Sequence, residues 1–568
     1  NIDRPESALK YYQEALSIRQ EVGDSRGEAA ALNGIGTVYS NIGQPESALK
    51  YYQEALPIRQ EVGDRGGEAT TLYSIGTVYS NIGQPESALK YYQEALSIRQ
   101  EVGYRRGEAA ALNGIGSVYS KIGQPESALK YYQEALPIRQ EVGDRPGEAA
   151  TVNNIGLVYG DIGQPKSALK YYQQALPILQ EVGDRSGEAT TLSNIGLVYR
   201  DTNQPNEAIQ KYQQSVQITL EMRADLQQQN RKFFIQDNRG TPTAFVDLLI
   251  DQNQPDEAFK WYNLATTFDL ADYTRLIGAK VKDPEAQKLL DELQQNRQRL
   301  QYLYARVENE WTPQLSQHIN QLTAETNELA EAAINRYPEV AEHLETDPED
   351  IDTLKANIPP GTLVIQPALL TRLKNVPNSI AIFLVSRDQA TLVKKVPIDG
   401  EEFDRILAEY RAQLQNPTAY KYVRNRKLLY NYLIRPVEAE IAAASPKQLA
   451  IIATGKLRYI PFETLYDAET DKYLLEKYPI HYLTRISANR PTANDTTAAT
   501  PRQILAFGNP IPAQIELQGA EEEAKTIVEI LSGELFIRER ATLATFQEKS
   551  PRFTLLHLAT HGDRKSVV

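Results

Sequence analysis

The chain has 568 residues, 41% of them apolar and 24% charged, which suffices for about two to four domains with hydrophobic cores. Its net charge of −13 and pI near 5.2 argue against a nucleic-acid or anionic-membrane binder, since both need a basic surface. The absence of cysteine excludes disulfides, thiolate metal sites and thiol catalysis within these residues, and it agrees with a reducing compartment. No apolar run approaches the roughly 18 residues of a membrane span, so we expect a soluble cytoplasmic protein.

An internal repeat dominates the first 223 residues. One proline context recurs every 40 residues, at Pro45, Pro85, Pro125, Pro165 and Pro205. A fixed period of this length is typical of a solenoid, in which each unit contacts only its neighbours. Gly43 and Pro45 punctuate the unit, because glycine supplies turn geometry and proline is tolerated only in the first turn of a helix. Each unit is therefore predicted to hold two helices.

The apolar positions of the unit resemble those of the tetratricopeptide repeat (TPR). The residues that match its pattern are Leu32, Ile35, Gly36, Tyr39, Ala48, Tyr52 and Ala55. The unit is longer than the usual repeat of roughly 34 residues, as in the extended repeats of kinesin-light-chain-like proteins. The resemblance implies an all-α solenoid over residues 1–223, with a partial first repeat, that docks a protein or peptide. The 18 tyrosines between Tyr11 and Tyr212 are expected to pack between repeats rather than to form a binding stripe.

By this resemblance, one position of each first helix is expected to face the concave groove of the solenoid. The residues at this position are Asn33, Tyr73, Asn113, Asn153 and Ser193. Asparagine can donate to and accept from a peptide backbone without selecting a particular side chain. We predict that these residues contact a protein or peptide partner, with a merely solvated face as the alternative.

The repeats lose their regularity after Val216. Residues 224–265 include Gln254, Pro255 and Ala258 of a worn repeat, and they are predicted to form a divergent unit that caps the solenoid. Residues 266–350 are rich in Gln, Glu, Leu and Ala with few helix breakers, which predicts a helical connector. Its mixed charge favours a solvated bridge over a membrane-bound helix.

From residue 351 the pattern changes to alternating strands and helices. Predicted strands cover 361–367, 379–385, 448–453, 503–507 and 553–559, and predicted helices cover 401–414, 428–444 and 520–531. This alternation indicates an α/β domain with a largely parallel sheet and helices on both faces. The predicted fold class is therefore multidomain, with an all-α solenoid, a helical connector and an α/β domain.

Four segments of the α/β region, in order, resemble the CHAT domain, a caspase-like peptidase module that accompanies TPRs in bacteria. They are Leu457–Leu465, Phe507–Pro510, Leu517–Ala524 and His557–Gly562. The resemblance implies a caspase-like domain over residues 351–562. In that family the last segment holds the catalytic histidine and an oxyanion-hole glycine, which would be His561 and Gly562 here.

The chemistry of a cysteine peptidase accounts for these residue types. An imidazole raises the thiolate fraction of the nucleophile and then protonates the departing amine, which is the role assigned to His561. The backbone N–H of Gly562 is assigned to the developing oxyanion, because glycine permits a close backbone approach. His557 lies inside the apolar run and is interpreted as structural.

No nucleophile is assigned. The cysteine of the family is expected after the next strand, the sequence has no cysteine, and Ser566 has no supporting motif. We interpret both ends of the chain as cut, residues 563–568 as a non-native tail, and the α/β domain as incomplete. We therefore expect no peptidase activity from these 568 residues.

Two functions remain open at this point. The first is a TPR-regulated cysteine endopeptidase of the CHAT family that docks a partner on its solenoid and cleaves a protein substrate. The second is a non-enzymatic protein-interaction scaffold with a degenerate CHAT domain. A metal-dependent hydrolase is disfavoured because no His-Glu-x-x-His pair occurs, and no metal, cofactor, nucleic-acid or membrane partner is expected.

Overall fold

The chain forms two compact units in a computed structural model. The first unit comprises Asn1–Thr241 and Asn296–Glu325, and the second comprises Pro242–Gln295 and Thr326–Val568. The structure describes residues 5–225, 240–264, 350–371, 373–414, 422–483, 504–510, 533–542 and 555–559, with short runs or single residues within 285–336 and 525–549. Among these residues, no helix combines the length and the hydropathy needed to cross a bilayer.

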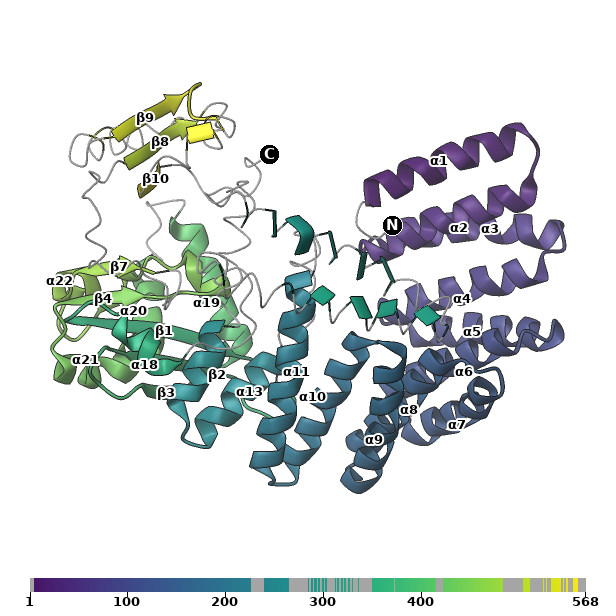
Figure 1. Cartoon of the computed structure of the whole chain (residues 1–568), viewed down its shortest axis with the longest axis horizontal. Coiled ribbons are helices and arrows are strands. Elements are labelled where there is room, and N and C mark those ends of the chain that lie inside the picture. The colour runs from purple at the N-terminus through teal and green to yellow at the C-terminus, as the bar shows by residue number, and fades with distance from the viewer. Residues whose placement is uncertain are drawn as a thin grey trace. The chain divides into compact units, whose positions relative to one another are not determined.

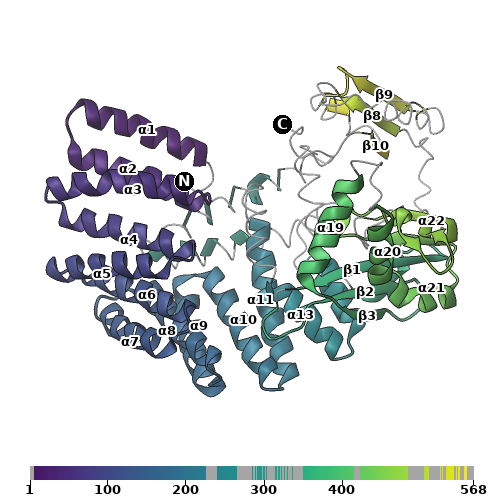
Figure 2. The same cartoon turned by 180° about the vertical axis from the view of Figure 1, so that it is seen from behind.

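Antiparallel helix pairs stack along the first unit (Figure 1), which confirms the predicted solenoid. The same pairs are seen from behind in Figure 2. The helices are α1 (Pro5–Glu21), α2 (Ser25–Asn41), α3 (Pro45–Glu61), α4 (Arg65–Asn81), α5 (Pro85–Glu101), α6 (Arg105–Lys121), α7 (Pro125–Glu141), α8 (Arg145–Asp161), α9 (Pro165–Val182), α10 (Arg185–Asp201) and α11 (Pro205–Asp225).

Local sequence sets where these helices begin. From α3 to α9, each second helix begins with proline, whose missing N–H would have no partner in the first turn. Most first helices follow an aspartate, and the Asp64 carboxylate accepts a hydrogen bond from the backbone N–H of Gly67 at 3.0 Å. These starts repeat every 40 residues, so the helices keep one length and register.

A tyrosine of each second helix packs directly on a glycine of the first helix in the same repeat. The ring of Tyr172 is 2% exposed, and it lies 2.8 Å from the point that a Cβ on Gly156 would occupy. The same contact joins Tyr52, Tyr92, Tyr132 and Tyr212 to Gly36, Gly76, Gly116 and Gly196. The glycines therefore let the two helices approach closely. Tyr52 also packs on Ile75 and Val78 of the next repeat, as predicted, whereas Tyr11 and Tyr104 are 68% and 51% exposed and depart from the prediction.

Ion pairs join the two helices of each repeat, and a glutamine hydrogen bond extends this network to the preceding repeat. The Arg145 guanidinium donates to Glu148 of its own helix at 2.6 Å and to Glu181 of the next second helix at 2.5 Å. Glu148 is buried and also accepts from Gln140 Nε2 at 2.9 Å. Equivalent arginines at 65, 105 and 185 make the same two contacts. The network satisfies the buried carboxylates and links each repeat to the next.

The second unit contains a five-stranded sheet with the strand order β3-β2-β1-β4-β7. Its strands are β1 (Thr362–Leu370), β2 (Ser379–Val385), β3 (Leu392–Pro397), β4 (Gln448–Ile451) and β7 (Ile480–Tyr482). β1 is antiparallel to β2, β2 is antiparallel to β3, and only the β1–β4 and β4–β7 pairs are parallel. The predicted largely parallel arrangement is wrong for this sheet, because the short connections after β1 and β2 leave no room for a crossover helix.

A second sheet consists of β8 (Ile504–Pro510), β9 (Gly533–Arg538) and β10 (Leu555–Ala559) in the order β10-β8-β9. Both of its pairings are parallel, as predicted. The shorter elements of the unit are α18 (Ile351–Ala356), η1 (Arg435–Val437), η2 (Gly455–Tyr459), η3 (Phe462–Thr464), β5 (Tyr466–Asp467), β6 (Lys472–Tyr473) and α22 (Leu474–Lys477). The predicted helix 520–531 lies for the most part outside the described residues.

Helices cover one face of the five-stranded sheet. They are α19 (Gly400–Leu414), α20 (Tyr422–Leu433) and α21 (Glu438–Ala444), and their apolar side chains form one core with the sheet. The single helix predicted over 428–444 is wrong, since Pro436 interrupts it in the 3₁₀ turn η1.

The opposite face of the sheet is covered by residues from before the α/β region. In the helix at 255–264, the rings of Phe259 and Tyr262 lie 5.7 and 5.9 Å from the ring of Phe383 on β2. From α13 (Gly240–Asp251), the buried Asp247 pairs with Lys395 of β3 at 2.6 Å. Residues 242–264 of the predicted capping unit 224–265 thus belong to the second unit, and most of the predicted connector 266–350 lies outside the described residues.

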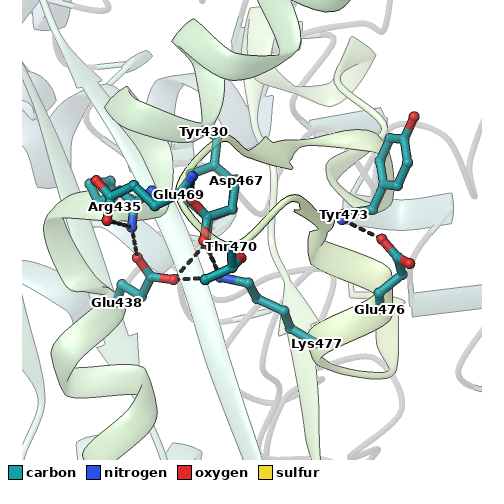
Figure 3. Close-up of polar contacts among 9 residues, drawn as sticks. All are labelled: Tyr430, Arg435, Glu438, Asp467, Glu469, Thr470, Tyr473, Glu476 and Lys477. Carbon is teal, nitrogen blue, oxygen red and sulfur yellow. Dashed lines mark hydrogen bonds and ion pairs between the residues drawn. The ribbon is translucent and has the colours of Figure 1, made fainter.

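A buried ionic cluster joins the helices of this unit to the hairpin β5–β6 (Figure 3). The carboxylate of Asp467 is fully buried, accepts from Lys477 Nζ at 2.5 Å and from Thr470 Oγ1 at 2.6 Å, and contacts the guanidinium of Arg435. Glu438 supplies the second carboxylate, bonded to Lys477 at 2.7 Å and to Arg435 at 2.5 Å. Arg435 and Lys477 therefore pair with Asp467 and Glu438, and the exposed Glu469 adds a further contact to Arg435 at 3.2 Å.

The cluster keeps its groups ionised. Burial by itself would raise the pKa of Asp467, but the hydrogen bonds from Lys477, Thr470, the backbone N–H of Glu469 and Arg435 together outweigh burial and lower that pKa below its ordinary value. Burial would likewise lower the pKa of Lys477, and its bonds to Asp467 and Glu438 raise it instead. We interpret the cluster as structural, because each of its charged groups is paired with another group of the cluster.

The tyrosine–glycine contact predicts opposite effects for two glycine substitutions. Gly156→Ala must push the buried Tyr172 ring aside and should destabilise the solenoid by about 1–3 kcal/mol. Gly66→Ala meets no atom within 4 Å at the start of α4, so it should stabilise by about 0.5–1 kcal/mol. Thermal melting of the two variants tests this. Equal melting temperatures for both would contradict the proposed role of the contact.

The ionic cluster predicts a pH-dependent loss of stability. Asp467→Asn leaves Arg435 and Lys477 short of one buried carboxylate and should cost about 3 kcal/mol at neutral pH. The folded-state pKa of Asp467 lies below its unfolded value of 3.8, so this stabilisation is present above that pH and lost as the pH falls below it.

Urea unfolding at pH 7 and pH 3 measures this effect. Wild type and Asp467→Asn should differ clearly at pH 7 and by less at pH 3, where protonation of the unfolded carboxyl removes part of the stabilisation. Glu469→Gln is the matched control, because Glu469 also contacts Arg435 but its side chain is 75% exposed, so it should shift stability by less than about 1 kcal/mol. A pH-independent difference for Asp467→Asn would refute the electrostatic explanation.

Candidate functional site

The five predicted groove residues occupy one equivalent position on the successive first helices α2, α4, α6, α8 and α10. All five, Asn33, Tyr73, Asn113, Asn153 and Ser193, are half-buried. Successive first helices contact one another along the array, whereas successive second helices approach each other less closely. The first helices thus line the more crowded, inner side of the stack.

Three of these residues are asparagines held in one orientation by the following repeat. The Oδ1 atoms of Asn33, Asn113 and Asn153 accept hydrogen bonds at 3.1, 3.3 and 2.9 Å. The donors are the hydroxyls of Thr71, Thr151 and Thr191, each fully buried and 38 residues further along the chain. The side-chain carbonyl of each asparagine is therefore used inside the solenoid.

Each asparagine keeps its other polar group available. Within the described residues, Nδ2 of Asn33, Asn113 and Asn153 makes no hydrogen bond. The hydroxyls of Thr71 and Thr151 also contact the carbonyl oxygens of Gly67 and Gly147 at 3.2 and 2.9 Å, so their single proton is shared between two acceptors. The contact with Oδ1 favours the amide orientation in which the N–H groups point away from the threonine. The arrangement presents oriented donors to a ligand that carries carbonyl oxygens.

Tyr73 interrupts the asparagine column, and the sequence compensates in the next repeat. Ala111 replaces the threonine that would serve an asparagine at position 73. The Tyr73 ring instead contacts the ring of Tyr92 at 5.1 Å and lies 4.6 Å from the guanidinium of Arg99. Asparagine on one first helix therefore occurs together with threonine 38 residues later. Comparing these two positions across the repeats could have revealed the pairing, whereas either position alone could not.

Arg99 is unusual among the arginines of this position. Arg59 and Arg139 pair with Asp64 and Asp144, but Tyr104 replaces the aspartate after Arg99. Arg99 is 5% exposed and donates to the carbonyl of Gly107 at 2.8 Å. Burial lowers the pKa of its guanidinium, and the nearby tyrosines partly oppose this shift. The Tyr73 ring takes over part of the charge stabilisation through a cation–π contact.

Ser193 differs from the other groove residues. Its hydroxyl is hydrogen-bonded to Thr241 Oγ1 at 2.8 Å. It has no side-chain amide and is already bonded within the first unit. The donors that the structure leaves for a partner are therefore those of the three asparagines.

One turn further along each first helix, the side chain on the inner face changes from polar in the early repeats to aliphatic in the later ones. Thr37 and Thr77 accept hydrogen bonds from the phenols of Tyr52 and Tyr92 at 3.1 and 3.0 Å. The equivalent residue of α8 is Leu157, which is 37% exposed. The inner face therefore offers hydroxyl groups in the early repeats and an aliphatic surface in the fourth.

The second candidate site lies at the carboxyl ends of β8 and β10. In this parallel pair, Ala559 is opposite Gly508, and His557 is opposite Ala506. β10 ends at Ala559, two residues before His561, and β8 ends with the Gly508–Pro510 part of the motif. The backbone thus brings two of the motifs to one edge of the sheet, the edge at which α/β proteins place their ligands.

The predicted catalytic residues themselves cannot be located further. His561 and Gly562 lie outside the described residues, as does the segment Leu517–Ala524. The remaining motif, Leu457–Leu465, covers η2 and η3 after β4. Tyr482 of β7 accepts from the backbone N–H of Phe462 at 2.6 Å and contacts the Glu463 carboxylate, so this motif is fixed to the edge strand. Among the described residues, no cluster of potential metal ligands occurs.

Comparison with known families gives two matches. A tetratricopeptide repeat model matches residues 2–61, 41–101, 67–141, 107–181 and 147–221. A CHAT domain model matches residues 424–566. The two matches occupy different parts of the chain, in the order predicted from the motifs.

Individual proteins are also similar to this chain. Tetratricopeptide repeat protein 28 of Mus musculus is 28% identical over 155 residues, which is 24% of this chain and 6% of that protein. Among solved structures, BtubC (BKLC) from P. vanneervenii has a TM-score of 0.34 and 20% identity, covering 38% of this chain and 90% of its own. A putative kinesin light chain of Podosopora anserina with nearly identical TPR-like repeats has a TM-score of 0.29 and 15% identity, covering 33% and 93%.

These matches agree with the helix pairs of the first unit and with the strands and helices of the second. Residues 2–221 of the chain thus match tetratricopeptide repeats, and residues 424–566 match the CHAT domain.

Proposed function

We propose that this chain is the docking and histidine-bearing part of a CHAT-family cysteine endopeptidase. Its solenoid binds a protein partner on the inner face, and its α/β region acts on a protein substrate. The match of residues 424–566 to the CHAT domain carries the proposal. The shared edge of β8 and β10 supports it, because the Gly508–Pro510 motif lies at the end of β8 and the sequence of the His561 motif continues from β10.

In this proposal His561 is the general base and acid. It takes the proton from a cysteine thiol, and the thiolate then attacks the peptide carbonyl carbon. The backbone N–H of Gly562 donates to the oxyanion of the tetrahedral intermediate, a contact typically worth about 3 kcal/mol. His561 returns its proton to the amine as the peptide bond breaks. These 568 residues contain no cysteine, so the proposal assigns the nucleophile to sequence outside them.

The partner of the solenoid is proposed to be an extended peptide segment. Its backbone carbonyls would accept from Nδ2 of Asn33, Asn113 and Asn153, whose orientation the threonine contacts already favour. Orienting these amides before binding lowers the entropy lost on association. The asparagines would bind main-chain atoms of the peptide. Selectivity for particular peptide side chains therefore has to come from neighbouring groove positions such as Tyr73 and Leu157.

A non-enzymatic scaffold is the second candidate. The amides of Asn33, Asn113 and Asn153 favour it, since docking a partner on them requires no thiol chemistry. In that case the α/β region would fold and present surfaces without cleaving a substrate.

Peptidase activity separates the two functions. We expect no casein cleavage from the 568 residues alone. The product of the complete source gene should cleave casein, and His561→Ala should lower the rate at least about 100-fold, because general acid–base catalysis is removed. Asn81→Ala, at an exposed site in α4, is the control and should leave the rate unchanged. An inactive full-length product, or an active His561→Ala variant, would favour the scaffold.

Peptide selection tests the groove. Peptides enriched on the 568-residue chain from a displayed random library should bind Asn113→Ala/Asn153→Ala at least about tenfold more weakly, because two oriented donors are lost. Asn81→Ala again provides the control with an unchanged groove. Fluorescence anisotropy of the selected peptides gives the dissociation constants. Equal affinity for wild type and the double variant would remove the asparagine column from the binding site.

A further inference from the structure

One short loop with an unchanged Glu-Val-Gly sequence follows the second helices α1, α3, α5, α7 and α9. The sequence Glu-Val-Gly occurs at 21–23, 61–63, 101–103, 141–143 and 181–183. All five glycines have positive φ angles between 65° and 75°. We call the valine side chain together with the space above the glycine a Val-Gly notch. The five notches have the same sequence and the same glycine conformation.

The fifth notch is filled by the protein itself. Val182 is fully buried in a cluster with Leu300, Leu303, Leu315, Ile319 and Leu322. Cγ2 of Ile319 lies 3.3 Å from the point that a Cβ on Gly183 would occupy. An aliphatic side chain therefore packs directly on the backbone of the notch, where a side chain in place of glycine would crowd it.

The other four notches are open in the part of the chain that the structure describes. Val22, Val102 and Val142 are 67%, 44% and 38% exposed, and Val62 is half-buried. No described atom lies within 4 Å of a Cβ placed on Gly23, Gly63, Gly103 or Gly143. Among the described residues, four notches are thus uncovered, and each has the same sequence as the fifth notch, which holds Ile319.

The surroundings of the notches favour an apolar occupant. At the third notch Tyr104 replaces the aspartate of the other repeats and is 51% exposed, which enlarges the apolar surface beside Val102. The charges next to the notches are already paired, with Arg105 bonded to Glu141 at 2.8 Å and Arg145 bonded to Glu181 at 2.5 Å. Burial of aliphatic side chains would therefore supply most of the binding free energy of a partner, because these neighbouring charges are already paired.

The side chains over the fifth notch show what such an occupant looks like. Leu315, Ile319 and Leu322 are spaced four and three residues apart, and the described residues of this segment are helical at 314–315, 318–319 and 321–322. This spacing places all three on one face of a helix. Binding of an apolar helical stripe is a common mode of recognition between a helix and a groove.

We propose that the open Val-Gly notches at 102–103 and 142–143 form a second docking surface, which takes an amphipathic helix of a protein partner. The partner helix carries aliphatic residues at the spacing of Leu315, Ile319 and Leu322. This surface is made by the loops, not by the asparagine column, and it does not depend on the peptidase proposal. These two notches share the Glu-Val-Gly sequence and the positive glycine φ with the fifth notch, which the chain already fills.

A peptide with the sequence of residues 312–326 is the probe. Labelled with fluorescein, it should bind the 568-residue chain saturably, and Val102→Asp/Val142→Asp should weaken binding at least tenfold. Ile42→Asp is the control, because Ile42 is an equally exposed aliphatic residue in a loop after a first helix, and it should leave binding unchanged. A probe with serine at the positions of Ile319 and Leu322 should not bind, which tests the proposal even if a protein variant misfolds.

Three results would overturn the proposal. The first is the absence of saturable binding. The second is full binding to Val102→Asp/Val142→Asp with loss only in Val182→Asp, because the probe would then merely exchange with the chain's own segment at the fifth notch. The third is self-association of the unliganded chain in sedimentation velocity that Val142→Asp abolishes, because the occupant would then be a second copy of the chain.

Discussion

The close approach of the two helices in each repeat is the constraint on which the solenoid depends. A tyrosine ring lies directly on a glycine, and this contact recurs from Tyr52 on Gly36 to Tyr212 on Gly196. It fixes the spacing of the helices and hence the register of successive first helices. Only in that register can the threonine hydroxyls reach the asparagine carbonyls of the preceding repeat and orient the amide donors. The inner face is therefore a consequence of packing between the helices.

The second unit obeys a different constraint, because both faces of its sheet are apolar and both must be covered. α19, α20 and α21 cover one face, and residues from before the α/β region cover the other. The helix at 255–264 keeps the Gln-Pro-x-x-Ala pattern of the repeats but packs on β2, so a repeat-like sequence has been used to complete a sheet. The ionic cluster around Asp467 then fixes the hairpin β5–β6 to α21 and η1.

Features with a fixed period or a strong local signal could be predicted from the sequence. The 40-residue period gave the solenoid, and the apolar run at 379–385 coincides with β2 at both ends. The order of the motifs predicted the CHAT domain that the family comparison supports. Pairings between distant residues could not be predicted in this way, because Arg435 and Asp467 are 32 residues apart and follow no period. The antiparallel β1–β2–β3 arrangement was missed for the same reason, since apolar runs do not reveal strand direction. His561 and Gly562 stay predictions.

The central claim is that the asparagine column presents preoriented donors to a peptide backbone. A crystal structure of the chain with a library-selected peptide tests it most directly. The account predicts main-chain carbonyl oxygens of the peptide within hydrogen-bonding distance of Nδ2 of Asn113 and Asn153, with the threonine bonds unchanged. A peptide bound elsewhere, or one that turns these amides away from Thr151 and Thr191, would contradict it.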